Sequence, residues 1–181
     1  MRITCVTSMT LLFAVPVCCI AQEQPEGTPV ELDVLAASVG TWDAEIEMWP
    51  AGPDSPSIKL TGVETNRPFG KHWIASDFES EYMGETMRAH TIVGYDLDEK
   101  KMVGMIVDHG PYAARMTGRY DEESKTVEWM TKARSPTGEP MLQKTRVTQK
   151  NADKRVLVMH MPVKQKDEFV KFMQITYVRR K

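Results

Sequence analysis

The sequence predicts an all-β protein, an antiparallel up-and-down barrel of about ten strands that follows a short N-terminal helix. First, strand-like segments follow one another at a spacing of about 8 to 12 residues, as in barrels and sandwiches. Second, no helical stretch separates these segments, so hairpins join them and neighbours pair antiparallel. Third, a closed barrel removes the exposed edges that such a meander would otherwise leave.

Residues 1–21 have the pattern of a secretory signal peptide. Arg2 provides a positive start, residues 3–20 are apolar and uncharged, and Cys19 and Ala21 place small residues at the −3 and −1 positions. We expect cleavage after Ala21, so that the mature chain begins at Gln22 and is exported, either periplasmic or secreted.

All three cysteines, Cys5, Cys18 and Cys19, fall within this segment. The mature chain therefore forms no disulfide and has no thiol nucleophile. The alternative is a lipoprotein signal with Cys18 or Cys19 lipidated, although residues 15–17 fit a lipobox poorly.

The mature chain is predicted to form one domain. Residues 22–29 are polar and contain two prolines and a glycine, which indicates a disordered leader. Residues 30–181 are enough for one sizeable core. Without residues 1–21 the net charge is −3, and both signs are scattered along the sequence. We therefore expect no nucleic-acid partner and no membrane attachment after signal cleavage.

The first predicted elements are a short helix and the strand Thr41–Met48. Leu32, Leu35 and Val39 have helical spacing, and at Gly40 the period changes, because a residue without Cβ can adopt a positive φ at a sharp entry. Strand alternation then separates an inward row from an outward row. The inward row is Trp42, Ala44, Ile46 and Met48, and the outward row is Asp43, Glu45 and Glu47.

The remaining strands are separated by segments rich in Gly, Pro, Asp and Ser, such as residues 50–56 and 135–140. They are predicted at Ile58–Thr65, His72–Glu81, Thr86–Tyr95, Met102–Asp108, Tyr112–Tyr120, Lys125–Lys132, Met141–Gln149, Arg155–Met161 and Glu168–Arg179.

A set of short motifs runs along nearly the whole mature chain. The motifs are Gly40-Thr41-Trp42, Phe69-Gly70-Lys71-His72-Trp73-Ile74, Gly94-Tyr95-Asp96, residues 103–108, Gly118-Arg119-Tyr120-Asp121 and residues 175–179. In this order and spacing the chain resembles a bacterial family of exported, calycin-like (lipocalin-like) barrel proteins with no established activity. The resemblance implies that Arg179 packs on Trp42 and that Gly40, Trp42 and Arg179 close one end of the barrel. Ile106 departs from the family, which often has Trp there.

The binding residues that we predict line the barrel interior. They are Ala44, Ile46, Met48, Ile106, Asp108 and Trp129. Ala44 is small between larger neighbours, and methionines within the strands adapt to varied apolar guests. These features favour a small apolar or amphipathic ligand inside the barrel.

Catalytic and metal motifs are not found in the sequence. The histidines lack metal-ligand spacing, and there is no nucleophile elbow. An alternative is a haem-binding or enzymatic barrel that uses one histidine, His160 or His90. Arg88 and Arg115 could hold a carboxylate if they point inward. The third possibility is a filled barrel with a structural or partner-binding role. The ligand and the oligomeric state are not set by the sequence.

Overall fold

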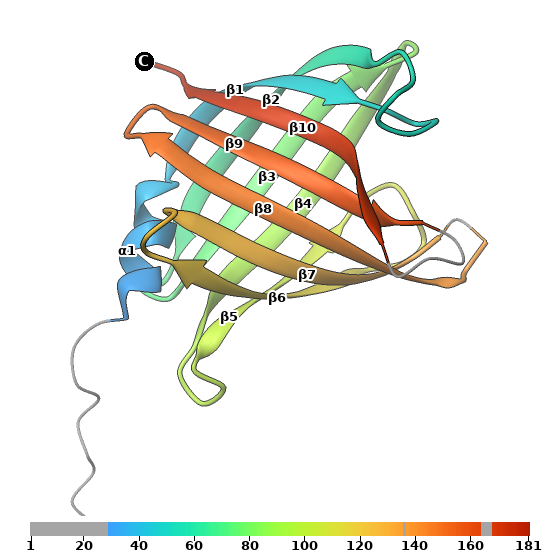
Figure 1. Cartoon of the computed structure of the whole chain (residues 1–181). Helices are drawn as coiled ribbons and strands as arrows, with labels where there is room; N and C mark the ends of the chain where they lie inside the picture. The colour runs from blue at the N-terminus through green and yellow to red at the C-terminus, as the bar shows by residue number, and fades with distance from the viewer. Residues whose placement is uncertain (1–28, 136, 164–167) are drawn as a thin grey trace, which may run out of the picture.

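Ten antiparallel strands close into a barrel in which each strand pairs with its sequence neighbours and β1 pairs with β10 (Figure 1). The computed structural model describes residues 29–135, 137–163 and 168–181. The predicted signal peptide and most of the predicted leader lie outside the described residues. The elements are α1 (Val30–Ala37), β1 (Gly40–Met48), β2 (Ile58–Phe69), β3 (Trp73–Tyr82), β4 (Glu85–Asp96), β5 (Lys101–Val107), β6 (Ala114–Asp121), β7 (Thr126–Arg134), β8 (Pro140–Asn151), β9 (Lys154–Pro162) and β10 (Phe169–Arg179).

The side chains of β1 alternate between the barrel interior and solvent, as the sequence predicts. Trp42, Ala44 and Ile46 are buried, whereas Asp43 and Glu45 are exposed. In β10, Tyr177 and Ile175 lie opposite Ala44 and Ile46, so the barrel closes between two inward rows. The predicted fold class, a closed up-and-down barrel after one short helix, is confirmed.

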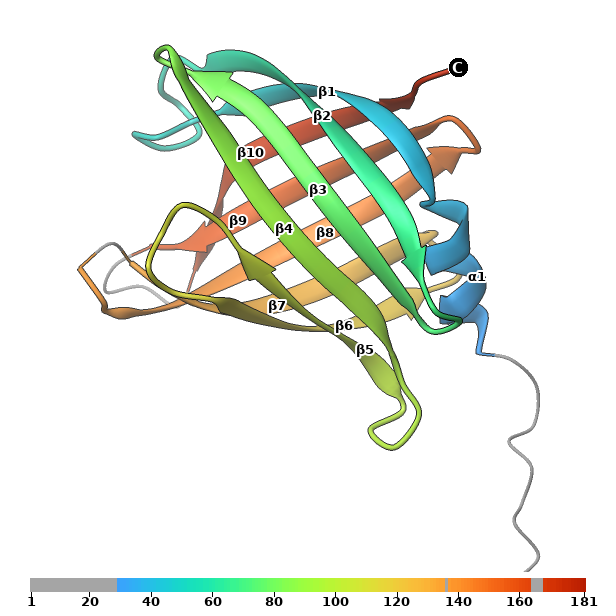
Figure 2. The same cartoon turned by 180° about the vertical axis from the view of Figure 1, so that it is seen from behind.

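The helix α1 lies at one end of the barrel, which we call the helix end. The β1–β2 and β5–β6 connections lie at the opposite end, the loop end (Figures 1 and 2). Leu35 of α1 is buried in a cluster with Ile74, Met102 and Trp129. The helix therefore packs on the hydrophobic core of the barrel and covers its end.

The turn from α1 into β1 depends on Gly40, as predicted. Its φ is +124°, where a side chain is strained, and a Cβ there would lie 2.7 Å from Nη1 of Arg179. Arg179 donates from the same Nη1 to the Val39 carbonyl and from Nη2 to the Ala37 carbonyl. Glycine thus leaves room for the arginine that joins the end of α1 to the last strand.

Strand β2 is longer than predicted and continues through Pro68 to Phe69. Proline normally interrupts a sheet because it cannot donate a backbone hydrogen bond. Here β1 begins at Gly40, opposite Asn66, so beyond Asn66 strand β2 has its registered neighbour only on the β3 side. Pro68 therefore occupies a stretch of β2 that lacks a β1 partner.

Candidate functional site

The half of the barrel interior nearest the loop end is lined by residues that keep part of their surface accessible. Strand pairing places these residues on the inward face, because each lies in register with other inward residues. They are Met48, Phe78, Thr91, Ile106, Met116, Met159 and Met173. In a tightly filled barrel such positions would be buried, as Trp42, Met102 and Trp129 are at the helix end. We call this set the loop-end lining.

Two of the six predicted lining residues, Met48 and Ile106, belong to this lining. Ala44, Ile46 and Trp129 also face inward, but they are buried in packed clusters. The expectation that they line open space is corrected accordingly. A Cβ added at Gly118 would lie 2.6 Å from the Trp129 ring, so that ring already fills the space beside the glycine.

The space expected beside Ala44 is filled by neighbouring aromatic residues. Ala44 lies opposite Tyr177 on one side and opposite Gly62 on the other. The Phe78 ring occupies the space above Gly62, since a Cβ there would lie 3.1 Å from Cζ of Phe78. The small residues of β1 and β2 therefore admit aromatic side chains of the protein itself.

Asp108 does not line the interior, and that prediction is wrong. β5 ends at Val107, and the exposed Asp108 follows it in the β5–β6 connection. Its Oδ1 accepts a hydrogen bond from the Gly110 backbone N–H at 2.7 Å. A carboxylate that caps a turn two residues later has a local structural role.

A buried ion pair lies at the helix end of the interior. Arg155 of β9 is 8% exposed and binds the carboxylate of Glu64 on β2. Asn66 donates to the same Glu64 oxygen at 2.6 Å and to the Ser38 carbonyl at 2.9 Å. This pair joins β2 and β9, which are far apart in sequence and are separated in the sheet by β1 and β10, and Asn66 ties it to the residue that follows α1.

Aromatic rings enclose Arg155 in this cluster. Its guanidinium carbon lies 4.5 Å from the ring centroids of both Trp42 and Tyr177. Burial, together with the neighbouring Glu64 carboxylate, raises the pKa of the Tyr177 phenol well above its usual value. Tyr177 therefore stays a neutral phenol, and the polar groups of this cluster are buried among aromatic rings.

The expected contact between Arg179 and Trp42 is present, with the guanidinium carbon 4.1 Å from the ring centroid. Trp42 is fully buried, and its indole N–H donates to the Ser38 carbonyl at 2.8 Å. Two arginines, one from β9 and one from β10, thus contact a single tryptophan. Sequence reasoning identified only Arg179.

The histidines offered as alternative ligands do not face the interior. His90 lies on the outer wall, where its Nδ1 contacts Asp77. His160 is in register with Lys144 and Lys171, also on the outer wall. An interior haem held by either residue would need the imidazole on the other face of its strand, so this alternative has no geometric support.

The two mid-strand arginines also point outward. Arg88 donates from Nε to Glu79 at 2.9 Å across the β3–β4 pair, and Arg115 is exposed. Within the described part of the chain, no group of three or more His, Cys, Asp or Glu side chains could hold a metal ion. Over the same residues, no helix is long and apolar enough to span a bilayer.

Comparison with known proteins places the chain among barrels of this kind. A model of the family described as "Protein of unknown function (DUF1579)" matches residues 30–179. No curated protein matches the sequence.

Two solved structures share the fold. The S-type phycobiliprotein lyase CPES from Guillardia theta is 13% identical, with a TM-score of 0.56 over 84% of this chain and 93% of that one. Rv2717c from M. tuberculosis is 10% identical, with a TM-score of 0.61 over 86% of this chain and all of that one. At these identities the likeness shows a shared calycin-like barrel and nothing about activity.

Proposed function

The chain belongs to the DUF1579 family, and from this premise we propose that it binds a small apolar or amphipathic molecule in the loop-end half of its barrel. The observation that carries the proposal is the loop-end lining, whose inward residues keep accessible surface while the helix-end half is packed. In barrels of about eight strands, side chains just fill the interior or leave room for one small ligand. A ten-stranded barrel is wider, so it has more interior space.

The chemistry of the lining suits an adaptable apolar guest. Four of its seven members are methionines, whose flexible thioether side chains adjust to irregular shapes. Thr91 belongs to the lining and keeps part of its surface accessible. Its hydroxyl can hydrogen bond to a polar group on the ligand, which favours an amphipathic molecule over a pure hydrocarbon.

The Glu64–Arg155 pair supports this role from the helix end. It neutralises both charges internally and binds Asn66, so an incoming ligand meets no uncompensated charge. We assign this cluster to closing the base of the site and the loop-end lining to contacting the ligand.

We further propose that the protein acts outside the cytoplasm. The pattern of residues 1–21 supports export, and the mature chain without cysteine tolerates either redox environment.

The test uses two neighbouring residues of β5 that point to opposite faces. Ile106 faces inward, and Met105 faces outward with 45% of its surface exposed. Uptake of the neutral fluorescent dye N-phenyl-1-naphthylamine is measured for wild type, Ile106→Trp and Met105→Trp. We expect Ile106→Trp to weaken uptake by at least about tenfold, because the indole occupies the lining, and Met105→Trp to bind as wild type does.

Equal dye binding by the two tryptophan variants would place the dye outside the barrel and contradict the proposal. A wild-type protein that takes up no dye would favour the filled barrel instead. Thermal melts of both variants check that each remains folded, since overpacking costs about 1–3 kcal/mol.

A further inference from the structure

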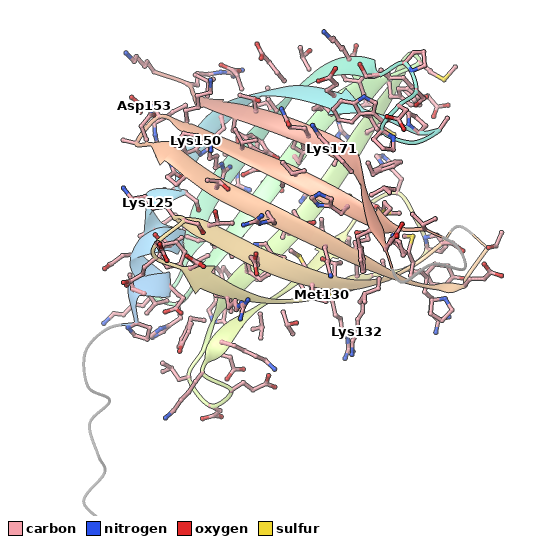
Figure 3. All side chains as sticks on the ribbon, viewed as in Figure 1. Lys125, Met130, Lys132, Lys150, Asp153 and Lys171 are labelled. Atoms are coloured by element: carbon pink, nitrogen blue, oxygen red, sulfur yellow. The ribbon has the colours of Figure 1, made fainter. Side chains whose placement is uncertain are left out.

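The fold gathers basic side chains on one part of the outer wall of the barrel. In the sequence these residues alternate with inward ones, so no charged run is visible. The exposed basic residues of strands β6–β9 are Arg115, Arg119, Lys132, Arg134, Lys144, Arg146, Lys150 and Lys154. Figure 3 shows Lys132 projecting away from the barrel wall. The scattered charge inferred from the sequence is thus sorted in space by strand register.

Two of these cations lie directly opposite each other, and basic residues also flank a histidine. Arg115 pairs in register with Lys132, and His160 lies between Lys144 on β8 and Lys171 on β10. Like charges directly opposite across strands destabilise a sheet. Such local conflicts are expected where function rather than stability selects the residue.

A groove of about 680 Å³ crosses this wall. Four of its lining residues are basic, namely Lys101, Arg119, Lys144 and Arg146. Met130 and Phe169 add apolar surface, and Nζ of Lys144 lies 4.2 Å from the Phe169 ring centroid. The volume lies within the range of about 300–1,000 Å³ typical of small-molecule sites. We call this feature the outer basic groove.

One carboxylate organises the groove. Glu128 accepts from Nη2 of Arg119 at 3.2 Å and contacts Nε of Arg146 at 3.3 Å. Each guanidinium carries five N–H donors, so contact with one carboxylate leaves donors for a ligand. Glu128 therefore holds two arginines in place and neutralises only part of their charge.

We propose that the outer basic groove is a second binding site, independent of the interior, for a small amphipathic molecule with a phosphate-type dianionic head group. The head group contacts Lys144 and the arginines beside Glu128, because guanidinium and ammonium groups bind phosphate oxygens through charge-assisted hydrogen bonds. The apolar part lies over Met130 and Phe169.

His160 reports on occupancy of the groove. Burial lowers the pKa of its imidazole, and the nearby Arg146, Lys171 and Lys144 lower it further. A bound dianion opposes these cations and favours the charged imidazole. The pKa of His160 should therefore rise when the groove is occupied.

The experiment measures binding of dodecyl phosphate, below its micelle concentration, and of inorganic phosphate by isothermal titration at low salt. We expect dodecyl phosphate to bind at least about tenfold more tightly, because its chain buries apolar surface. In Lys144→Gln/Arg119→Gln, binding of both probes should weaken by about tenfold or more. Lys59→Gln, on β2 of the opposite wall, is the control and should bind as wild type does.

Three further readouts separate the groove from the interior and from misfolding. Ile106→Trp, which fills the interior, should still bind dodecyl phosphate. The proton NMR titration of His160 should shift to higher pH with saturating dodecyl phosphate. The melting temperature of Lys144→Gln/Arg119→Gln should stay close to that of wild type, and the single variant Lys144→Gln provides the same comparison with less perturbation.

The proposal is overturned if wild type binds neither probe, or if Lys144→Gln/Arg119→Gln binds as wild type does. Equal affinity for the two probes would remove the apolar part of the site. Loss of dodecyl phosphate binding in Ile106→Trp alone would assign the probe to the interior, and the groove would then have no role.

Discussion

Replacement of Arg155 by methionine should destabilise the barrel by about 3–5 kcal/mol. The arginine is 8% exposed, and its partner Glu64 has a side chain only 14% exposed. Methionine keeps much of the stem volume between Trp42 and Tyr177 but leaves the Glu64 carboxylate buried without its cation. The cost therefore comes mainly from an uncompensated buried charge and only in part from lost packing.

A second substitution separates these contributions. In Arg155→Met/Glu64→Leu neither charge of the buried pair remains. Replacing a buried ion pair by apolar residues often leaves the free energy of unfolding unchanged or raises it. We expect the double variant to recover most of the loss. Arg115→Met, at an exposed position of β6, is the control and should change stability by no more than about 0.5 kcal/mol.

The assay is unfolding in guanidinium chloride followed by circular dichroism, with midpoints compared at constant slope. If Arg155→Met unfolds at the same midpoint as Arg115→Met, the pair is not buried in solution. If the double variant is as unstable as Arg155→Met, the loss comes from packing and the argument from charge fails.

Three further outcomes are expected. Trp42→Ala should lower the free energy of unfolding by about 3–5 kcal/mol, as expected for a large buried aromatic residue. Trp49 is half-buried just after β1, so Trp49→Ala should lower it clearly less in the same unfolding assay. Equal losses would contradict the assigned core. The pKa of the Tyr177 phenol is raised in the folded state, so the stability that Tyr177 contributes is complete below the usual phenol pKa of 10.0 and is lost as pH rises above that value. Melting temperatures between about pH 8 and 11 should therefore fall less steeply in Tyr177→Phe than in wild type or in Tyr112→Phe. N-terminal sequencing of exported protein should find Gln22 first, and a sequence beginning at Met1 or a lipidated cysteine would refute the predicted cleavage.

The strand architecture was predictable because local pattern determines it. The alternation of Thr41–Met48 identifies an inward row, and Gly40 indicates the entry into the strand. Closure between β1 and β10 follows from the need to cover two edges. The length of β2 was not predicted, because a proline usually ends a strand. Pro68 is tolerated within β2 because β1 does not pair with that stretch of the strand.

The Glu64–Arg155 pair was not predictable, because it joins residues 91 positions apart on two strands that do not pair with each other. A local signal existed in the alternation of β9, where Arg155 shares a face with Leu157 and Met159. Val156 and Val158 on the other face are equally apolar, so the inward side could not be chosen from sequence. The register shift between Lys171 and Met173 adds a further change of face in the partner strand.

The open space was placed too near the start of β1. Ala44 appeared to leave a gap, but the fold fills that region with Tyr177 and Phe78. Among the predicted lining residues, Met48 and Ile106, closer to the loop end, keep part of their surface accessible. Sequence gives the size of a side chain and the face it occupies, whereas the side chains that fill a gap come from neighbouring strands of the closed sheet, here β10 and β3.

The most direct test of the interior site is a methyl NMR titration of protein labelled at the methionine ε-methyl groups, with N-phenyl-1-naphthylamine added stepwise. Four methionines belong to the loop-end lining, Met48, Met116, Met159 and Met173, while Met83, in the β3–β4 turn, and Met105, on the outer face of β5, are exposed outside it. We predict that the four inward methyl signals shift together and saturate at one dye per protein, with the exposed signals unchanged. Shifts confined to the exposed methyl groups, or no shift at all, would contradict an interior binding site.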